Sequence, residues 1–131
     1  DVFFTSLNMP NTPVVIVIYG DLWIRGTYTG VYTIYCSHDI IVNGNLAPAN
    51  GASYLALIAN HKIRIESTAS SVEAVFYSHR LDNTGLIEVK GSKTITGSVA
   101  ADDITTDSPT TFQPSSRLNL HVFKQLRLPG G

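Results

Sequence analysis

Three histidines recur at intervals that could place their rings side by side. His38, His61 and His79 each follow a small polar residue and precede a charged one. Imidazoles stacked on successive coils of a repeat could share a Zn²⁺ or Cu²⁺ ion, with Asp102 or Asp103 extending the set. Such a ladder, however, points its rings in parallel, whereas metal ligands converge on one point. We therefore expect neither a metal nor a cofactor, and favour a pH-sensitive patch in which stacked rings resist full protonation.

The acidic residues offer two other chemistries. The aspartates within residues 102–107 could bind Ca²⁺ through oxygen ligands, but no evenly spaced acidic loop containing glycine supports such a site, which favours solvated turns. Asp21, Asp39 and Glu66 could act as paired carboxylates in sugar chemistry. They fall at corners of different coils, and no basic residue shares a wall with them. We therefore expect no catalytic residue and no enzyme activity.

Aromatic residues form the candidate binding face. Trp23 lies between two apolar residues that are predicted to point inward, so its own ring is predicted to point outward. Tyr28, Tyr32 and Tyr54 join it in a predicted row of exposed rings. Such a row could stack on sugars or nucleobases or dock a partner protein, and the rings could equally stack on one another.

The elements that must position these residues are short strands in a repeat. Residues 31–44, VYTIYCSHDIIVNG, have a strand, a polar corner, a second strand and a closing Asn-Gly. Residues 15–26, 55–67 and 72–91 contain degraded copies, spaced by roughly 18 to 24 residues, a period typical of solenoids. The strands are rich in Val, Ile, Tyr and Thr and end in turn residues, and no segment has a helical period with caps.

The recurrence of corner residues in the same order favours parallel coils over an antiparallel sandwich, because equivalent residues then stack about 4.8 Å apart. The sequence therefore predicts an all-β fold, a right-handed parallel β-helix (β-solenoid) of about five to six short coils. Gly26 is placed over Gly44. The predicted inward columns are Ile16, Ile34, Leu57 and Val75; Ile18, Cys36, Ala59 and Tyr77; Leu22, Ile40, Ile63 and Ile87; and Ile24, Val42, Ile65 and Val89.

A single domain accounts for all 131 residues. Residues 1–14 do not fit the repeat and are predicted to be an N-terminal cap or a docking segment, because an open solenoid end exposes core and strand edge. Residues 15–104 are the predicted coils, with Val99 and Ile104 pointing inward. Residues 105–117 form a Ser/Thr/Pro-rich loop, and residues 118–131 a closing strand and tail.

Composition limits the partners. The chain has 9 basic and 10 acidic side chains, a net charge of −1, so no basic field attracts nucleic acid. Charged residues make up 15% of the chain, below the roughly 25% usual for soluble domains, which indicates turns and stacked polar ladders instead. A single cysteine, Cys36, cannot form an internal disulfide and is expected to be a small buried hydrophobe. No membrane span is expected, and we expect the chain to be a processed or excised piece.

Four segments carry a resemblance to a known family. Residues 32–44, 55–65, 74–77 and 85–92 are similar to the β-solenoid regions of surface proteins associated with bacterial type IV pili. There, an S-x-D-I-x-I-x-G segment precedes L-x-L-I-A-x-x-x-I-x-I, A-x-F-x-S and G-x-I-x-V-x-G-S. The basic and apolar end of the chain, residues 123–131, resembles the usual ending of that family.

The resemblance implies an extracellular domain carried on a large minor pilin or a pilus adhesin, although the hydrophobic helix of pilins is absent from this sequence. It predicts a non-enzymatic structural and adhesive module that presents a flat face to a surface, a glycan, DNA or other subunits of the appendage. The first alternative is an extracellular filament subunit that polymerises through its solenoid ends, as bactofilin-like proteins do, or by exchange of residues 1–14. The second is a carbohydrate-active β-helix enzyme.

Overall fold

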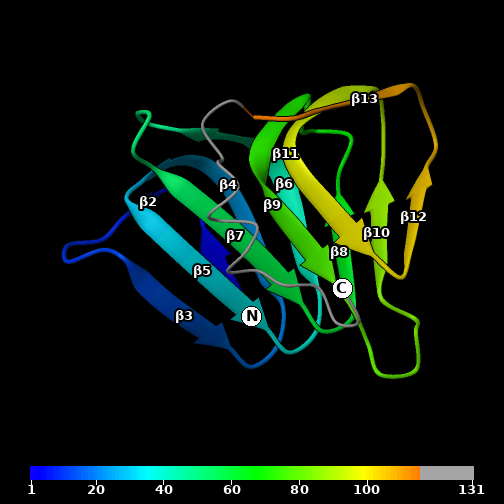
Figure 1. The fold of residues 1–131 in the computed structure, drawn as a ribbon, viewed down its shortest axis with the longest axis horizontal. Coiled ribbons are helices and arrows are strands. Elements are labelled where there is room, and N and C mark those ends of the chain that lie inside the picture. The colour runs from blue at the N-terminus through cyan, green and yellow to red at the C-terminus, as the bar shows by residue number, and fades with distance from the viewer. Residues whose placement is uncertain (116–131) are drawn as a thin grey trace.

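The computed structural model describes residues 1–115, which form a β-solenoid of about six turns (Figure 1). Every strand pair is parallel, and no helix occurs among these residues. The described part of the chain accordingly offers no helix that could cross a membrane. The predicted β-solenoid is confirmed.

Thirteen strands make up the solenoid. They are β1 (Val2–Phe4), β2 (Leu7–Asn8), β3 (Val14–Ile18), β4 (Leu22–Thr29), β5 (Val31–Cys36), β6 (Ile40–Pro48), β7 (Tyr54–Ala59), β8 (Lys62–Ile65), β9 (Ser71–Ser78), β10 (Leu86–Val89), β11 (Lys93–Ala101), β12 (Asp103–Thr106) and β13 (Thr110–Gln113).

The strands stack into three walls around one core. The first wall contains β1, the beginnings of β4 and β6, then β8, β10 and β12. The second contains β2, the ends of β4 and β6, the beginnings of β9 and β11, and β13. The third contains β3, β5, β7 and the ends of β9 and β11. The long strands β4, β6, β9 and β11 bend from one wall into the next.

Two predicted core columns are confirmed in full. Leu22 pairs with Ile40, Ile40 with Ile63, and Ile63 with Ile87. The neighbouring column from Ile24 to Val89 has the predicted register as well, and all eight side chains are at most 1% exposed. Apart from Val89, which pairs with Thr106 on one side, these positions have apolar neighbours above and below, so their type follows directly from the stacking.

The columns of the third wall are confirmed through three coils and shifted in the fourth. Leu57 pairs with Phe76, not with the predicted Val75, and Ala59 pairs with Ser78, not with Tyr77. A shift of one residue exchanges the two faces of a strand. The Phe76 ring therefore fills the interior, at 1% exposure.

The N-terminal segment is part of the repeat, which corrects the expectation that it lies outside it. β1 pairs with β4, with Val2 at Leu22, and β2 pairs with the end of β4, with Leu7 at Tyr28. Leu7 is buried. Residues 1–14 therefore begin a first coil that β3 completes on β5, and within the described residues the outer edge of this coil has no strand beside it.

The expected alignment of Gly26 with Gly44 is wrong. The register of β4 on β6 shifts after Ile24, so that Gly26 lies at Leu46. Gly26 has a φ of 100°, and a Cβ atom there would lie 2.0 Å from the carbonyl oxygen of Thr5. The glycine thus allows the first coil to pass close to the bend of β4.

The last described segment contains strands where a loop was expected. β12 extends to Thr106 and pairs with β10, and β13 pairs with the beginning of β11. Ile104 stacks on the buried Ile87 and so faces inward as predicted, but it is 39% exposed because it lies in the last described coil. The predicted closing strand and tail, residues 118–131, lie outside the described residues.

Candidate binding surfaces and the histidine corner

The histidine corner lies between the third and first walls. His38 and His61 occupy successive coils, since the backbone N–H of His61 donates to the carbonyl oxygen of His38 at 3.3 Å. His79 directly follows Ser78, which pairs with Ala59, so it lies one position short of His61. The predicted alignment of three histidines is therefore wrong for His79, because it was counted along the shifted strand β9.

Two of these rings each bind a carboxylate. Nδ1 of His61 donates to Oδ1 of Asp39 at 2.7 Å, and the backbone N–H of Asp39 donates to Oδ1 of Asp21 at 3.0 Å. Glu66, at the far end of the first wall, binds Arg64 at 2.8 Å. These carboxylates connect neighbouring coils or neighbouring side chains, and Glu66 does not lie beside the two aspartates, so the three do not form a shared acidic site.

Asp102 closes the loop that connects β9 to β10. Its Oδ1 accepts a hydrogen bond from Nδ1 of His79 at 2.7 Å, and its Oδ2 accepts from the backbone N–H groups of Arg80 at 3.1 Å and Gly85 at 2.7 Å. The His79 hydrogen bond and these backbone donors hold the pKa of Asp102 below its ordinary value. The carboxylate thus organises the loop by staying ionised.

No metal-binding cluster forms among residues 1–115: nowhere in them do three His, Cys, Asp or Glu side chains lie close enough to share an ion. The other aspartates of the calcium hypothesis are used separately. Oδ1 of Asp103 accepts the backbone N–H of Ile104, while Oδ1 of Asp107 accepts that of Gly91. Each side chain serves its own turn.

Two of the four tyrosines and tryptophans expected to be exposed are buried, which corrects the predicted binding face. Tyr28 and Tyr32 are each 1% exposed. Their hydroxyl groups have partners inside the solenoid: that of Tyr28 donates to the carbonyl oxygen of Glu73 at 2.8 Å, and that of Tyr32 accepts the N–H of Met9 at 2.8 Å. Burying a tyrosine is inexpensive when its hydroxyl is hydrogen-bonded.

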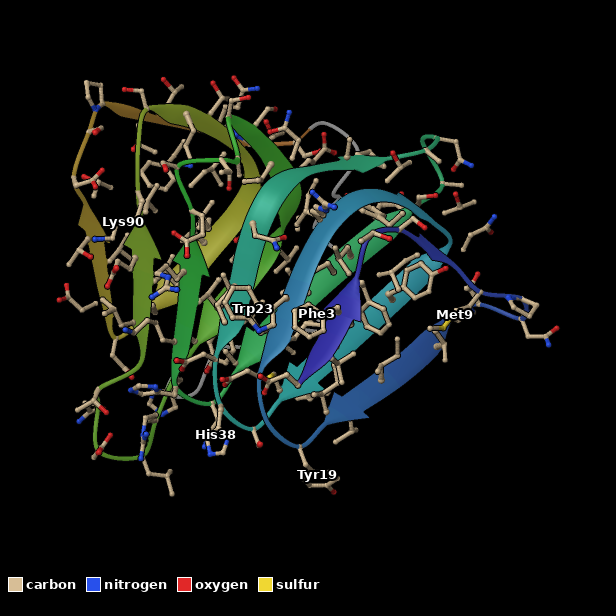
Figure 2. The ribbon with its side chains drawn as sticks, turned by 180° about the vertical axis from the view of Figure 1, so that it is seen from behind. Phe3, Met9, Tyr19, Trp23, His38 and Lys90 are labelled. Atoms are coloured by element: carbon tan, nitrogen blue, oxygen red, sulfur yellow. The ribbon has the colours of Figure 1, made fainter. Side chains whose placement is uncertain are left out.

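Trp23 points outward as predicted, but β1 covers part of its surface. The rings of Phe3 and Trp23 stack with centroids 5.9 Å apart and planes 15° apart, and Figure 2 shows them side by side on the first wall. Beneath Trp23 in the same outward column, Ile41 is only 5% exposed. Phe3, at 66% exposure, is therefore the outermost member of an apolar stack on the outside of the solenoid. Tyr54 lies half-buried on the outer side of the third wall.

The outer side of the third wall has no charged side chain in two of its columns. Val17, Tyr35, Ile58, Tyr77 and Ala100 form one column. The second consists of Val15, Thr33, Ala56, Val75 and Ser98. Val15, Val17 and Tyr35 are exposed, whereas Ala56 and Val75 are buried and do not belong to the accessible surface. The first wall differs, because its later coils contain the ion pairs Lys62–Glu88, Arg64–Glu66 and Lys90–Glu88.

Two buried polar groups stabilise corners of the solenoid. Cys36 is buried as expected, and its thiol donates to the carbonyl oxygen of Gly20 at 2.8 Å; burial raises its pKa. Lys93 is only 6% exposed, and its ammonium group donates to the carbonyl oxygens of Glu66 at 2.7 Å and Ala69. Burial lowers the pKa of Lys93. Sequence reasoning did not single out Lys93, because nothing in its neighbourhood distinguishes it from a surface lysine.

Comparisons of this chain with family models, with curated proteins and with solved structures find no match. The resemblance to type IV pilus-associated proteins therefore stays a prediction. The geometry of the walls and of the solenoid ends is what a functional proposal must use.

Proposed function

We propose that this protein is a non-enzymatic structural and adhesive module, which binds a partner through the outer side of its third wall. The observation that carries the proposal is the uncharged patch of exposed apolar side chains, Val15, Val17 and Tyr35, on neighbouring strands of this wall. Isolated exposed apolar residues are common on proteins, but a contiguous apolar surface marks an interaction site. Tyr35 gives this surface an aromatic ring that is suited to stacking on a sugar or packing against a protein.

The solenoid gives that surface its rigidity. Tyr35 lies on β5, which is paired on both sides, whereas Val15 and Val17 lie on the edge strand β3, which is paired with β5 along its whole length. Regular pairing limits how much this surface changes when a partner binds. The absence of positive charge in the two columns favours a glycan or an uncharged protein surface over DNA, whose binding depends on neutralising phosphates.

The resemblance supplies the setting of the proposal: an extracellular module on a type IV pilus-like appendage. Its partners there would be other subunits of the appendage or a glycan on the contacted surface, with DNA as the less favoured ligand.

The test is a panel of glycans immobilised on an array, together with immobilised duplex DNA, probed with the purified chain. We expect saturable binding to at least one glycan and a loss of at least tenfold in affinity for Tyr35→Asp and for Val17→Asp, since both side chains are exposed and their replacement spares the core. Leu81→Asp is the matched control, because Leu81 is fully exposed in the loop after β9 and lies outside the two columns. Glycan binding that survives both wall substitutions would remove the third wall from the site, and DNA binding alone would overturn the preference for a glycan.

A second candidate, the self-assembling filament subunit, is favoured by the solenoid ends. Within the described residues, the first coil has β1 and β3 at an edge with no further strand, and β12 and β13 are edges at the other end. Sedimentation of the purified chain over a concentration series separates the two candidates. Open-ended growth in mass supports a filament, and a monomer of 14.2 kDa at every concentration supports the adhesive module.

A further inference from the structure

The last coil of the solenoid has strands on only two walls in the described residues, whereas every earlier coil has strands on all three. β12 stacks on β10 in the first wall, and β13 stacks on β11 in the second. In the third wall, residues 97–101 of β11 pair with β9 on one side, and within residues 1–115 no strand pairs with their other side. Figure 1 shows β11 at this end of the third wall with β12 and β13 beyond it.

A groove lies on the third wall, at the place where a strand of this last coil would lie. It has a volume of about 430 Å³ and lies between the end of β11, β12 and β13. Val99, Ile104 and Phe112 line it, and no charged residue does. Ile104 and Phe112 are 39% and 48% exposed, although they stack on the buried side chains Ile87 and Ile95. They face the interior side of the coil but lack the cover that a strand on the third wall gives in every earlier coil.

The chemistry of the groove specifies its ligand. A parallel strand about 4.8 Å from residues 97–101 would pair with their free edge, and its alternate side chains would enter the groove. These side chains must be apolar, because the lining is uncharged and apolar groups gain most from burial there. Asp102 and Asp103 directly follow the free edge, so a basic residue near the carboxyl end of the added strand would meet negative charge.

We propose that this groove binds an extended segment of a partner polypeptide, which adds to the third wall as a parallel strand beside residues 97–101. The site is separate from the outer side of the third wall, and it uses the open end of the solenoid. The partner segment has apolar residues at alternate positions and a basic residue after them.

The test uses the full chain and a fluorescent peptide with the sequence of residues 117–124, RLNLHVFK, which has the required alternation and a lysine at its end. Fluorescence anisotropy should show saturable binding. A peptide of the same composition with its apolar residues made consecutive should bind at least tenfold more weakly. Hydrogen exchange should show slower exchange of the backbone amides of residues 97–101 when the first peptide is present.

Substitutions locate the site. Ile104→Asp and Phe112→Asp should each weaken binding at least tenfold, because they bring a carboxylate into the groove; both side chains are already partly exposed, so the solenoid should tolerate them. Tyr19→Asp, at an exposed position that follows β3 in the first coil, at the opposite end of the solenoid, should leave binding unchanged. The proposal is overturned if no saturable binding occurs. Competition for the groove by residues 116–131 of the same chain would give this result and would equally overturn binding of a partner. It is also overturned if the rearranged peptide or the groove variants bind equally well.

Discussion

At the scale of single residues, the thiol of Cys36 illustrates how the solenoid interior suppresses reactivity. Its pKa is raised by burial and, to a smaller degree, by the nearby carboxylate of Asp21, and thiolates are the reactive form. We predict that a chromogenic disulfide reagent modifies Cys36 only as fast as the protein unfolds, and modifies it at once in denaturant. Rapid labelling under native conditions would contradict burial of the thiol.

Lys93, by contrast with the neutral thiol, is a charged group in a buried corner. Replacing it by methionine removes the ammonium donor from the carbonyl oxygens of Glu66 and Ala69, of which that of Glu66 keeps the backbone N–H of Ala69. The loss should cost about 1–3 kcal/mol of stability, measured by urea unfolding at pH 7. Lys90→Met, on the outer side of the first wall, is the matched control and should change stability by less than about 0.5 kcal/mol. Equal effects of the two substitutions would contradict a structural role for the buried ammonium group.

The same residue predicts a pH dependence. Burial lowers the pKa of Lys93 below 10.5, so between its folded pKa and 10.5 the unfolded chain binds more protons than the folded one. The part of the stability that depends on the protonation of this group is therefore complete above 10.5 and is lost as the pH falls through the folded pKa, while the hydrogen bonds of the side chain contribute separately. The free energy of unfolding of the natural protein minus that of Lys93→Met should rise with pH in this window, whereas a flat difference would contradict the shift.

At the scale of elements, one pair of aromatic rings joins β1 to β4 in addition to their backbone pairing. Phe3→Ala removes the ring that covers Trp23, which should cost about 1 kcal/mol and shift the emission of this single tryptophan to the red as water reaches the indole. Tyr19→Ala is the control, because Tyr19 is 89% exposed at the same end of the molecule. Unchanged tryptophan emission in Phe3→Ala would mean that β1 does not shield Trp23.

The strands also show how much of the fold could be predicted from the sequence alone. The columns beginning at Leu22 and Ile24 could be predicted, because strand spacing admits only apolar side chains at enclosed positions. The burial of Tyr32 could have been read from the sequence too, since it has the parity of Ile34 in β5. Corner residues were a poor guide: the corners differ in length, and aligning His79 with His61 displaced β9 by one position.

Other features needed three-dimensional information. Phe3 and Trp23 come into contact only because residues 1–14 belong to the repeat. The two prolines and the short strands of residues 1–14 give no sign in the sequence that this segment belongs to the repeat. The register shift of β4 at Gly26 could not be predicted either, because the sequence before and after the shift has the residue types of a regular strand. The surface of the third wall was overlooked because aliphatic residues outside a β-solenoid look like core residues in the sequence.

At the scale of the whole molecule, stability should be highest in the middle of the stack. Ile63 is fully buried between coils on both sides, so Ile63→Ala should cost about 2–5 kcal/mol. Ile16 belongs to the first coil and is only half-buried, so Ile16→Ala should cost clearly less. Urea unfolding of both variants measures the difference, and equal losses would contradict a stack whose terminal coils contribute least.

The parallel pairing of all the strands has a consequence for the time that folding takes. No two consecutive strands form a hairpin in the described residues, and each strand finds its partner about 20 residues away, so every pairing first requires the closure of a loop. Chains dominated by such distant contacts fold in milliseconds to seconds, whereas helical proteins need only microseconds. The chain thus spends longer with its strand edges unpaired, and during that interval neighbouring chains at high concentration compete with its own next coil for the same backbone hydrogen bonds.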